Sequence, residues 1–268
     1  MARTVLITGA SQGIGKATAL LFAQKGYDVV LAAREPDRLN SVAQEIRFKG
    51  HDALAVSTDV SDPHQVDILV ERALAAYGHI DVLINNAGIC MSGPMEKTSL
   101  EDWHKIFDVN LWGYIHTIQA LLPQFLAQKA GTIVNVGSFG GKVPLPYMTA
   151  YCTSKYAVTG LTETLRLELE PKGIQVCGVH PSVTNSAFLE RSLFRGQDDE
   201  EINKRQQQMA QMLESPFTSQ PEDVAQAIWD VVKRPQAEVV VGSTAVATTT
   251  YRLAPGLMNL ILKRTLKT

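Results

Sequence analysis

Short apolar segments rich in β-branched residues recur along this chain, with little alternation between apolar and polar positions. Such segments are typical of parallel strands that are covered on both faces. They predict seven strands, at Val5–Ile7, Val29–Ala32, Ala53–Val56, Val82–Ile84, Ile133–Val136, Ile174–Val179 and Val239–Val241.

Between these segments the apolar residues take the spacing of a helix. The positions from Leu39 to Ile46 and from Val66 to Ala73 follow i, i+3, i+4, i+7. Strand and helix alternate without a linker or repeat, and parallel neighbours require crossover helices. We therefore predict an α/β fold in which residues 1–268 form a single domain: a doubly wound parallel sheet of about seven strands with helices on both faces. Ligands of such sheets bind beyond the carboxyl ends of the strands.

Composition argues against several other classes of protein. With 25 basic and 27 acidic residues, the net charge of −2 is unlike that of a nucleic-acid or anionic-membrane binder.

Cys90, Cys152 and Cys177 have no metal-ligand spacing, so we expect reduced thiols in a cytoplasmic protein and no metal site. The N-terminus shows no cleavable signal. The 20 uncharged residues from Val109 to Gln128 include several polar groups and predict a buried helix rather than a membrane span.

A glycine-rich turn follows the first predicted strand. Residues Thr8–Gly15 read T-G-A-S-Q-G-I-G, and a helical period starts at Ile14. This arrangement allows backbone N–H groups to approach a pyrophosphate at the positive end of a helix. Lys16 follows Gly15, but the turn does not have the G-x-x-x-x-G-K-[ST] spacing of a P-loop. The same loop is also compatible with a tight turn that only packs the helix closely.

The ends of the second and third strands bear on which dinucleotide fits. Arg34 lies just past the second strand, with no acidic residue at the strand terminus. An arginine there pairs with a 2′-phosphate, which favours NADP(H) over NAD(H), although Arg34 also fits a solvated surface residue. Asp59 and Val60 follow the third strand, and the Asp59 carboxylate is a candidate acceptor for the adenine amino group. Its alternative role is capping the next helix, for which Ser61 and Asp62 compete.

Polar residues after the later strands point to catalysis. Tyr151 and Lys155 are spaced i, i+4 and share one face of a predicted helix. A free tyrosine has a pKa of about 10, and a neighbouring ammonium lowers that pKa toward the neutral range where acid–base catalysis operates. Ser138, at the carboxyl edge of the sheet, is a candidate donor to a substrate carbonyl. Alone, the YxxxK pattern also fits an ordinary amphipathic helix.

Together these motifs resemble the short-chain dehydrogenase/reductase family. The resemblance covers about residues 3–242, includes the 13-residue gap from Ser138 to Tyr151, and rests on Thr8–Gly15, Asp59, Asn85–Gly88, Asn110, Ser138, Tyr151 and Lys155. It implies a Rossmann-type fold and a catalytic tetrad of Asn110, Ser138, Tyr151 and Lys155. In that family the tyrosine is the general acid/base, and the lysine lowers its pKa and holds the nicotinamide ribose. The serine orients the carbonyl, and the asparagine anchors a water in a proton relay.

The motifs and the resemblance together assign a set of cofactor-binding residues to this chain. They are Gly9, Ser11, Gln12, Gly13, Ile14, Gly15, Arg34, Asp59, Val60, Asn86, Ala87, Gly88, Tyr151, Lys155, Pro181 and Val183. Three positions depart from the family pattern. Ser182 replaces a glycine and Ser186 a threonine, so the contact to the nicotinamide carboxamide is not assigned. Gln12 is neutral where some NADP-binding relatives carry a basic residue, which leaves Arg34 as the main argument for NADP.

The substrate side follows the sixth predicted strand. Residues 185–220 are longer than an ordinary connection and predict a substrate lid. The candidates for an apolar pocket, or for plain packing of the lid on the body, are Phe139, Leu145, Tyr147, Met148, Phe188, Leu189, Leu193 and Phe194. Residues 248–268 predict an amphipathic C-terminal tail, for which we expect docking on protein rather than contact with a membrane.

These observations predict an NADP(H)-dependent oxidoreductase that transfers a hydride between nicotinamide and a carbonyl or secondary alcohol. A lipophilic small molecule is the expected substrate, with Tyr151 as the general acid/base. One alternative, a dinucleotide-binding regulator without turnover, would be expected to lack a tetrad member. Another, an epimerase or dehydratase of nucleotide sugars, would typically carry an extended C-terminal domain. Apolar side chains on more than one face of Leu111–Gln128 and of the helix after Tyr151 indicate that both helices have packing partners on two sides. The family resemblance implies that these helices pair between copies of the chain in a homodimer or homotetramer.

Overall fold

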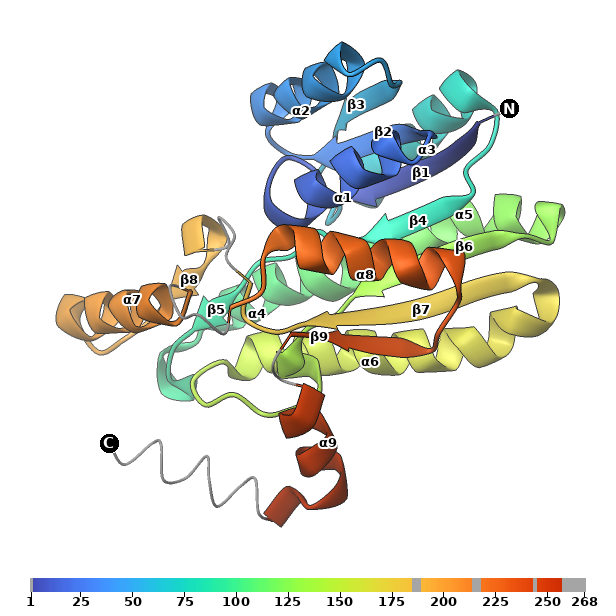
Figure 1. Cartoon of the computed structure of the whole chain (residues 1–268). Helices are drawn as coiled ribbons and strands as arrows, with labels where there is room; N and C mark the ends of the chain where they lie inside the picture. The colour runs from blue at the N-terminus through green and yellow to red at the C-terminus, as the bar shows by residue number, and fades with distance from the viewer. Residues whose placement is uncertain (1, 185–188, 214–217, 243–244, 257–268) are drawn as a thin grey trace.

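A computed structural model describes residues 2–184, 189–213, 218–242 and 245–256 of the chain. Seven parallel strands form one sheet in the order β3-β2-β1-β4-β6-β7-β9 (Figure 1). Their bounds are β1 (Arg3–Thr8), β2 (Tyr27–Ala33), β3 (Ala53–Ser57), β4 (Val82–Asn85), β6 (Gly131–Val136), β7 (Ile174–Pro181) and β9 (Glu238–Val241). Each predicted apolar segment lies within one of these strands, so the predicted sheet is confirmed.

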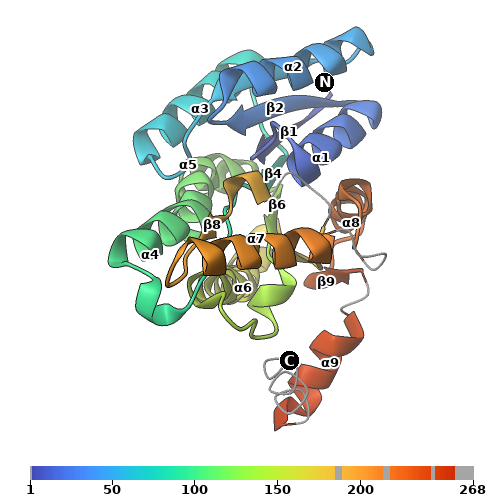
Figure 2. The ribbon, with the colours of Figure 1, turned by 90° about the vertical axis from the view of Figure 1, so that its left-hand side faces the viewer.

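Helices cover both faces of the sheet (Figure 2). Val5 and Ile7 of β1 pack in a core with α1 (Gly13–Gln24), α2 (Pro36–Phe48) and α8 (Pro221–Lys233). Leu6, between them, points to the opposite core with α3 (Pro63–Tyr77), α5 (Gly113–Gln128) and α6 (Thr149–Leu169). Successive side chains of a strand point to opposite faces, so burial of both faces explains why these strands lack apolar–polar alternation.

The uncharged stretch from Val109 to Gln128 is not one regular helix. The helix α4 (Leu100–Phe107), which begins at a capping box of Ser99 and Asp102, runs into a π-helical turn η2 (Asp108–Trp112) and then into α5. The predicted helix is therefore confirmed, and its first turn is wound as a π-helix, with one more residue in the turn than in a regular α-helix. None of the helices in the described residues is long and apolar enough to cross a membrane.

Short elements complete the chain. The 3₁₀ turns are η1 (Met95–Lys97), η3 (Phe139–Gly141), η4 (Glu170–Lys172) and η5 (Leu189–Arg191). After β7, strand β8 (Leu193–Phe194) pairs in parallel with β5 (Met91–Ser92), and α7 (Asp199–Leu213) follows. The last described helix is α9 (Ala245–Leu253). Residues 185–188 and 214–217 of the predicted lid and 257–268 of the predicted tail lie outside the described residues, so both assignments stay predictions.

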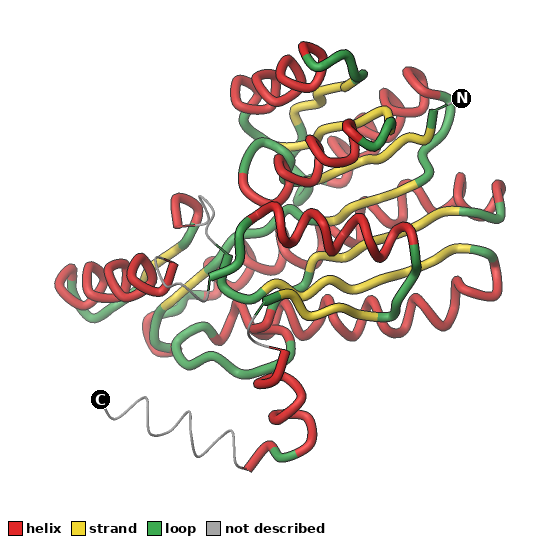
Figure 3. Tube along the Cα trace, in the orientation of Figure 1, coloured by secondary structure: helices red, strands yellow, loops and turns green. Residues whose placement is uncertain are grey.

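The carboxyl ends of the sheet strands lie on the left in Figure 1, on the same side as β5, β8 and α7. Loops follow the strands at this edge (green in Figure 3). Strand β1 lies between β2 and β4, so the chain leaves β1 toward one side and returns at β4 on the other. Such a change of direction opens a crevice between the loops, which is where doubly wound sheets bind ligands.

Candidate active site

The turn between β1 and α1 is held against the loop after β4. Thr8 Oγ1 accepts hydrogen bonds of 3.0 Å from the backbone N–H groups of Asn86 and Ala87, and Asn86 Nδ2 donates to Thr8 O at 2.9 Å. Gly9 has a φ of +66°, and a Cβ on Gly15 would lie 2.2 Å from the Gly9 carbonyl oxygen. Glycine is therefore required at both positions for α1 to begin this close to the strand end.

Two hollows meet at this edge of the sheet. The larger one contains twelve of the sequence-predicted residues: Gly9, Gln12, Gly13, Ile14, Asn86, Ala87, Gly88, Ser138, Tyr151, Lys155, Pro181 and Val183. The smaller one is lined by Gly9, Arg34, Asp59, Val60, Ala87 and Gly88 among the predicted residues. The two hollows adjoin each other, because both are bordered by Gly9, Ala87 and Gly88. Ser11, Gly15 and Asn110 line neither hollow.

Ser138 and Tyr151 lie next to each other in the wall of the larger hollow. Ser138 follows β6 and caps η3, where its Oγ accepts a hydrogen bond of 3.0 Å from the Gly140 N–H. Tyr151, in the first turn of α6, is only 7% exposed. Burial raises the pKa of the Tyr151 phenol, while a hydrogen bond with the Ser138 side chain acts to lower it. The two hydroxyl groups are thus close enough to hold the same substrate oxygen.

Lys155 lies one turn further along α6, but its ammonium is directed elsewhere. Nζ donates to the Val136 carbonyl at 3.0 Å and to the Tyr114 hydroxyl at 3.5 Å. Burial lowers the pKa of Lys155 to about 8. Burial of the phenol outweighs the other influences on it, so the Tyr151 pKa is raised in this structure, and its lowering by the ammonium stays a prediction.

Asn110 lies in the π turn, fully buried. Its Oδ1 accepts from the Ile89 N–H at 2.9 Å, and its Nδ2 donates to the Ile89 carbonyl and to Ser154 Oγ, both at 3.0 Å. The side chain therefore joins the loop after β4 to α6 and has no contact with the larger hollow. π turns occur often at functional sites.

Asp59 does not cap α3, which was the alternative role considered for it from the sequence. Asp62 caps α3, accepting hydrogen bonds from the N–H groups of His64 and Gln65. Asp59 Oδ1 instead accepts from the Ser61 N–H at 3.0 Å and hydroxyl at 2.7 Å, which orients the carboxylate at the smaller hollow. Glu35 also lines this hollow and was not predicted, although it is adjacent to Arg34.

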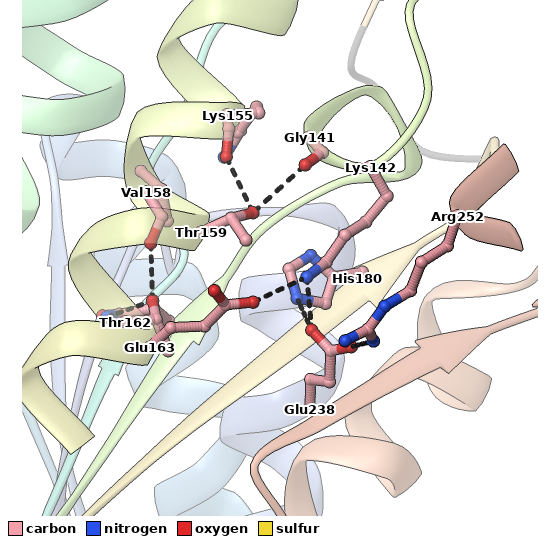
Figure 4. Close-up of polar contacts among 11 residues, drawn as sticks. Gly141, Lys142, Lys155, Val158, Thr159, Thr162, Glu163, His180, Glu238 and Arg252 are labelled. Atoms are coloured by element: carbon pink, nitrogen blue, oxygen red, sulfur yellow. Dashed lines mark hydrogen bonds and ion pairs between the residues drawn. The ribbon is translucent and has the colours of Figure 1, made fainter. Parts of the chain in front are cut away.

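A polar network connects residues of α6, β7 and β9 with Gly141 and Lys142, at the end of η3 (Figure 4). The Thr159 hydroxyl contacts the carbonyls of Lys155 at 3.1 Å and Gly141 at 3.3 Å, which ties α6 to η3. Glu238 of β9 makes ion pairs with Lys142 and Arg252, and its carboxylate lies 3.7 Å from Nε2 of His180. His180 is buried, and burial, followed by the charge of Lys142, lowers its pKa to about 4. The network joins the carboxyl end of β7 and the amino end of β9 to the turn that follows β6.

The apolar wall of the larger hollow differs in part from the prediction. Phe139, Leu145 and Met148 line it as expected. Leu193 and Phe194 do not, because they form β8. Tyr147 does not either, since its ring lies under Arg205 and is 47% exposed. The expected Phe188, Ser186 and the Leu189 side chain lie outside the described residues.

Besides Val136 and Gly137, at and just after the end of β6, five residues of the larger hollow were not predicted. They are Ser182 and Thr184 after β7, Arg191 in η5, and Met209 and Leu213 in α7. Ser182 is the departure already noted at the end of β7. The others come from the segment between β7 and α8, where no motif singles out individual positions. Their placement depends on how this segment folds back over the sheet edge.

Comparison with known proteins identifies the family. A model of the family described as short chain dehydrogenase matches residues 3–197. The chain belongs to this family. Among its relatives, the uncharacterized oxidoreductase Lmo0432 of Listeria monocytogenes is 38% identical over 190 residues, covering 70% of this chain and 77% of that protein. The 3-oxoacyl-[acyl-carrier-protein] reductase FabG of Staphylococcus aureus is 36% identical over 182 residues, covering 68% and 74%.

Solved structures of short-chain dehydrogenases share the whole fold. A short-chain dehydrogenase from Streptomyces avermitilis has a TM-score of 0.84 and 29% identity, covering 99% of this chain and 97% of that one. A relative from Burkholderia phymatum in complex with NAD has a TM-score of 0.83 and 28% identity, covering 95% and 91%. An alcohol dehydrogenase from Thermococcus sibiricus complexed with 5-hydroxy-NADP has a TM-score of 0.77 and 27% identity, covering 91% and 97%. This protein is thus an oxidoreductase of a family that uses NAD(P) for hydride transfer.

Proposed function

We propose that this short-chain dehydrogenase is an NADP(H)-dependent carbonyl reductase or alcohol dehydrogenase for a lipophilic substrate. The observation that carries the proposal is the joint placement of Ser138, Tyr151 and Lys155 in one hollow that also borders the glycine-rich turn. The groups that act on a carbonyl oxygen and the backbone that would hold a dinucleotide therefore face the same space. A regulator without turnover would have no need of this arrangement.

The residues of the two hollows fit a nicotinamide dinucleotide. The α1 N-terminus and the close-packed glycines offer backbone N–H groups to phosphates. Asp59 lines the smaller hollow and supplies an acceptor for an adenine amino group. The Arg34 guanidinium has no hydrogen bond or ion pair within the described residues and stays available for a 2′-phosphate. This availability favours NADP(H), and relatives of the same fold hold either NAD or an NADP derivative.

The bound cofactor supplies the hydride chemistry, and the protein supplies position and charge. Ser138 is placed to orient the substrate carbonyl, and Tyr151 to transfer a proton to or from its oxygen. The Lys155 ammonium lies on the same wall and would stabilise negative charge on the phenol as the proton leaves. The Asn110 side-chain oxygen and nitrogen are both hydrogen-bonded, to Ile89 and Ser154. In a proton relay, Asn110 would therefore hold a water through its backbone groups in the π turn.

The apolar side chains of the larger hollow support a lipophilic substrate. The hollow that contains Tyr151 is also lined by Phe139, Leu145, Met148, Met209 and Leu213. Methionine side chains adapt to different apolar shapes, so the wall favours a class of carbonyl compounds rather than one polar metabolite. The similarity to a 3-oxoacyl-[acyl-carrier-protein] reductase adds acyl thioesters to the candidates.

A substrate screen tests the proposal. The purified chain is mixed with NADPH or NADH and with aldehydes, aliphatic ketones, steroid ketones or 3-oxoacyl thioesters, and cofactor oxidation is followed. Reactions without a carbonyl compound serve as the control. We expect NADPH oxidation with at least one lipophilic class. Tight dinucleotide binding without turnover on any class would favour the regulator, and no dinucleotide binding at all would refute the proposal.

A further inference from the structure

Arg191 reaches from the segment after β7 back to the glycine-rich turn. Its Nη2 donates a hydrogen bond of 3.1 Å to Ser11 Oγ and lies 3.9 Å from a carboxylate oxygen of Glu35. Arg191 borders both the larger and the smaller hollow, as Gly9 does. Arg191 therefore lies at the junction of the two hollows.

The guanidinium of Arg191 has donors that the described residues leave unused. An arginine offers five N–H donors in a planar fork. Its Nε is buried without a hydrogen-bond partner in the described part of the chain, and Nη2 is bonded to the neutral Ser11 hydroxyl. A buried donor without a partner costs free energy, so an acceptor in the adjoining hollow would be favoured there.

The surroundings of Arg191 also favour an anion. Arg34 and Arg38 are close enough to repel its charge, while burial is the largest influence lowering the Arg191 pKa and Glu35 opposes it. Arg38 already pairs with both nearby acids, Glu35 at 3.1 Å and Glu190 at 2.9 Å. The three arginines are therefore incompletely neutralised where the hollows meet.

We propose that Arg191 is a ligand of the cofactor diphosphate. A dinucleotide that fills both hollows crosses the junction between Gly9 and Arg191, and the part of it that links the two nucleosides is the diphosphate. The assignment rests on the proposed function and deepens it: one diphosphate ligand comes from the substrate-side segment and not from the glycine-rich turn. The guanidinium fork matches phosphate oxygens, and Arg34 is left for the 2′-phosphate.

Binding measurements with two cofactors separate the diphosphate from the 2′-phosphate, since both are phosphate groups. Dissociation constants of NADPH and NADH are measured by fluorescence for the unchanged chain and for Arg191→Met, Arg191→Lys and Glu190→Gln. Loss of the diphosphate contact weakens both cofactors by about tenfold or more in Arg191→Met. Arg191→Lys restores part of the affinity because the charge remains without the fork. Adenosine, which has no phosphate, binds all four proteins equally.

Several outcomes overturn the assignment. Weakening of NADPH alone in Arg191→Met would move Arg191 to the 2′-phosphate, and unchanged affinity for both cofactors would remove it from the site. Glu190→Gln removes the ion pair between Arg38 and Glu190, the residue before Arg191, and leaves Arg191 itself unchanged. An equal loss in this control would show that docking of the segment, and not the guanidinium, matters. If the unchanged chain binds neither cofactor, the proposed function fails as well, whereas binding without an Arg191 effect refutes only this assignment.

Discussion

The ammonium of Lys155 donates a 3.0 Å hydrogen bond to the Val136 carbonyl, the last residue of β6, rather than to the phenol of Tyr151 one turn earlier on α6. The buried cation is thus held by the sheet edge. Tyr114 donates to the same carbonyl at 2.9 Å, so Val136 keeps a partner even without the lysine. The fold therefore does not depend on Lys155 to satisfy the Val136 carbonyl.

The first prediction follows from this arrangement: Lys155→Met loses most activity but unfolds no more easily than the unchanged protein at pH 7. Burial lowers the pKa of Lys155 to about 8, so the folded state binds this proton more weakly than the unfolded state does. The resulting destabilisation is full below pH 8 and disappears as pH rises toward the unfolded value near 10.5. At pH 7 it reaches up to about 3 kcal/mol.

Thermal unfolding of both proteins between pH 7 and pH 10 tests this prediction. The advantage of Lys155→Met should be largest at pH 7 and shrink toward pH 10. A variant that is less stable than the unchanged protein at pH 7, or a difference that does not depend on pH, would contradict it.

Tyr151→Phe should abolish turnover and leave dinucleotide affinity within about twofold of the unchanged protein. The phenol is placed for proton transfer, whereas cofactor contacts are spread over the glycine-rich turn, Arg34 and Asp59. Steady-state rates with the best substrate of the screen and NADPH titrations measure the two effects. Tyr156→Phe, one turn further along α6 and 40% exposed, is the matched control and should keep full activity. Substantial activity in Tyr151→Phe would refute the mechanism.

Arg34→Ala should remove the preference for NADPH over NADH. Arg34 lines the smaller hollow, and a charge-assisted hydrogen bond to a 2′-phosphate corresponds to about ten- to a hundredfold in affinity. Titration of both cofactors into both proteins gives the ratio, which should fall mainly through weaker NADPH binding. The neighbouring Glu35 could instead accept from a ribose 2′-hydroxyl. Equal affinities for the two cofactors in the unchanged protein would favour that reading.

The protein should associate through apolar side chains at the start and end of α5 and along α6. Trp112, Leu126, Tyr156 and Leu167 are between 39% and 66% exposed. Sedimentation at micromolar concentration should show a dimer or tetramer, and Leu167→Glu combined with Trp112→Glu should shift it toward monomer. Phe48→Glu on α2, where the side chain is 94% exposed, is the control and should change nothing. A monomer in the unchanged protein would refute this prediction.

The stability of the fold should fall below neutral pH because of the network in Figure 4. Burial and Lys142 lower the pKa of His180 to about 4, so the unfolded state gains this proton first as pH falls below 6.5. Burial acts to raise the Glu238 pKa, but its hydrogen bond with Lys142 holds it below its usual value, so that contribution also disappears in acid. The His180 contribution to the unfolding free energy is lost between pH 6.5 and pH 4, by up to about 3 kcal/mol.

Chemical unfolding at pH 7 and pH 4.5 measures this effect in the unchanged chain and in His180→Gln. The loss on acidification should be smaller in His180→Gln, because the buried titrating group is gone. His64→Gln, at an exposed position on α3, should lose as much stability as the unchanged protein. The same loss in all three proteins would exclude His180 as the cause.

The main sheet was predictable because its signals are local. A strand such as β2, buried on both faces, is apolar at nearly every position, and the helix from Leu39 to Ile46 repeats its apolar residues with the period of its own turns. The parallel arrangement then follows from the connections. The short pairing of β5 with β8 was not predicted, because two residues on each strand carry no pattern and about a hundred residues separate them along the chain.

Within the candidate site, the sequence by itself determined the residues that belong to motifs next to strand ends: the glycine-rich turn, Ser138, and the pair Tyr151 and Lys155. These positions follow from parallel topology, which brings all strand ends to one edge. Only the tertiary structure decided where their polar atoms point, as for the ammonium bonded to Val136, and which long-range residues complete the hollows. Arg191 is 180 positions from the Ser11 hydroxyl that it contacts, and no local pattern encodes an approach that depends on how a whole segment packs over the sheet edge.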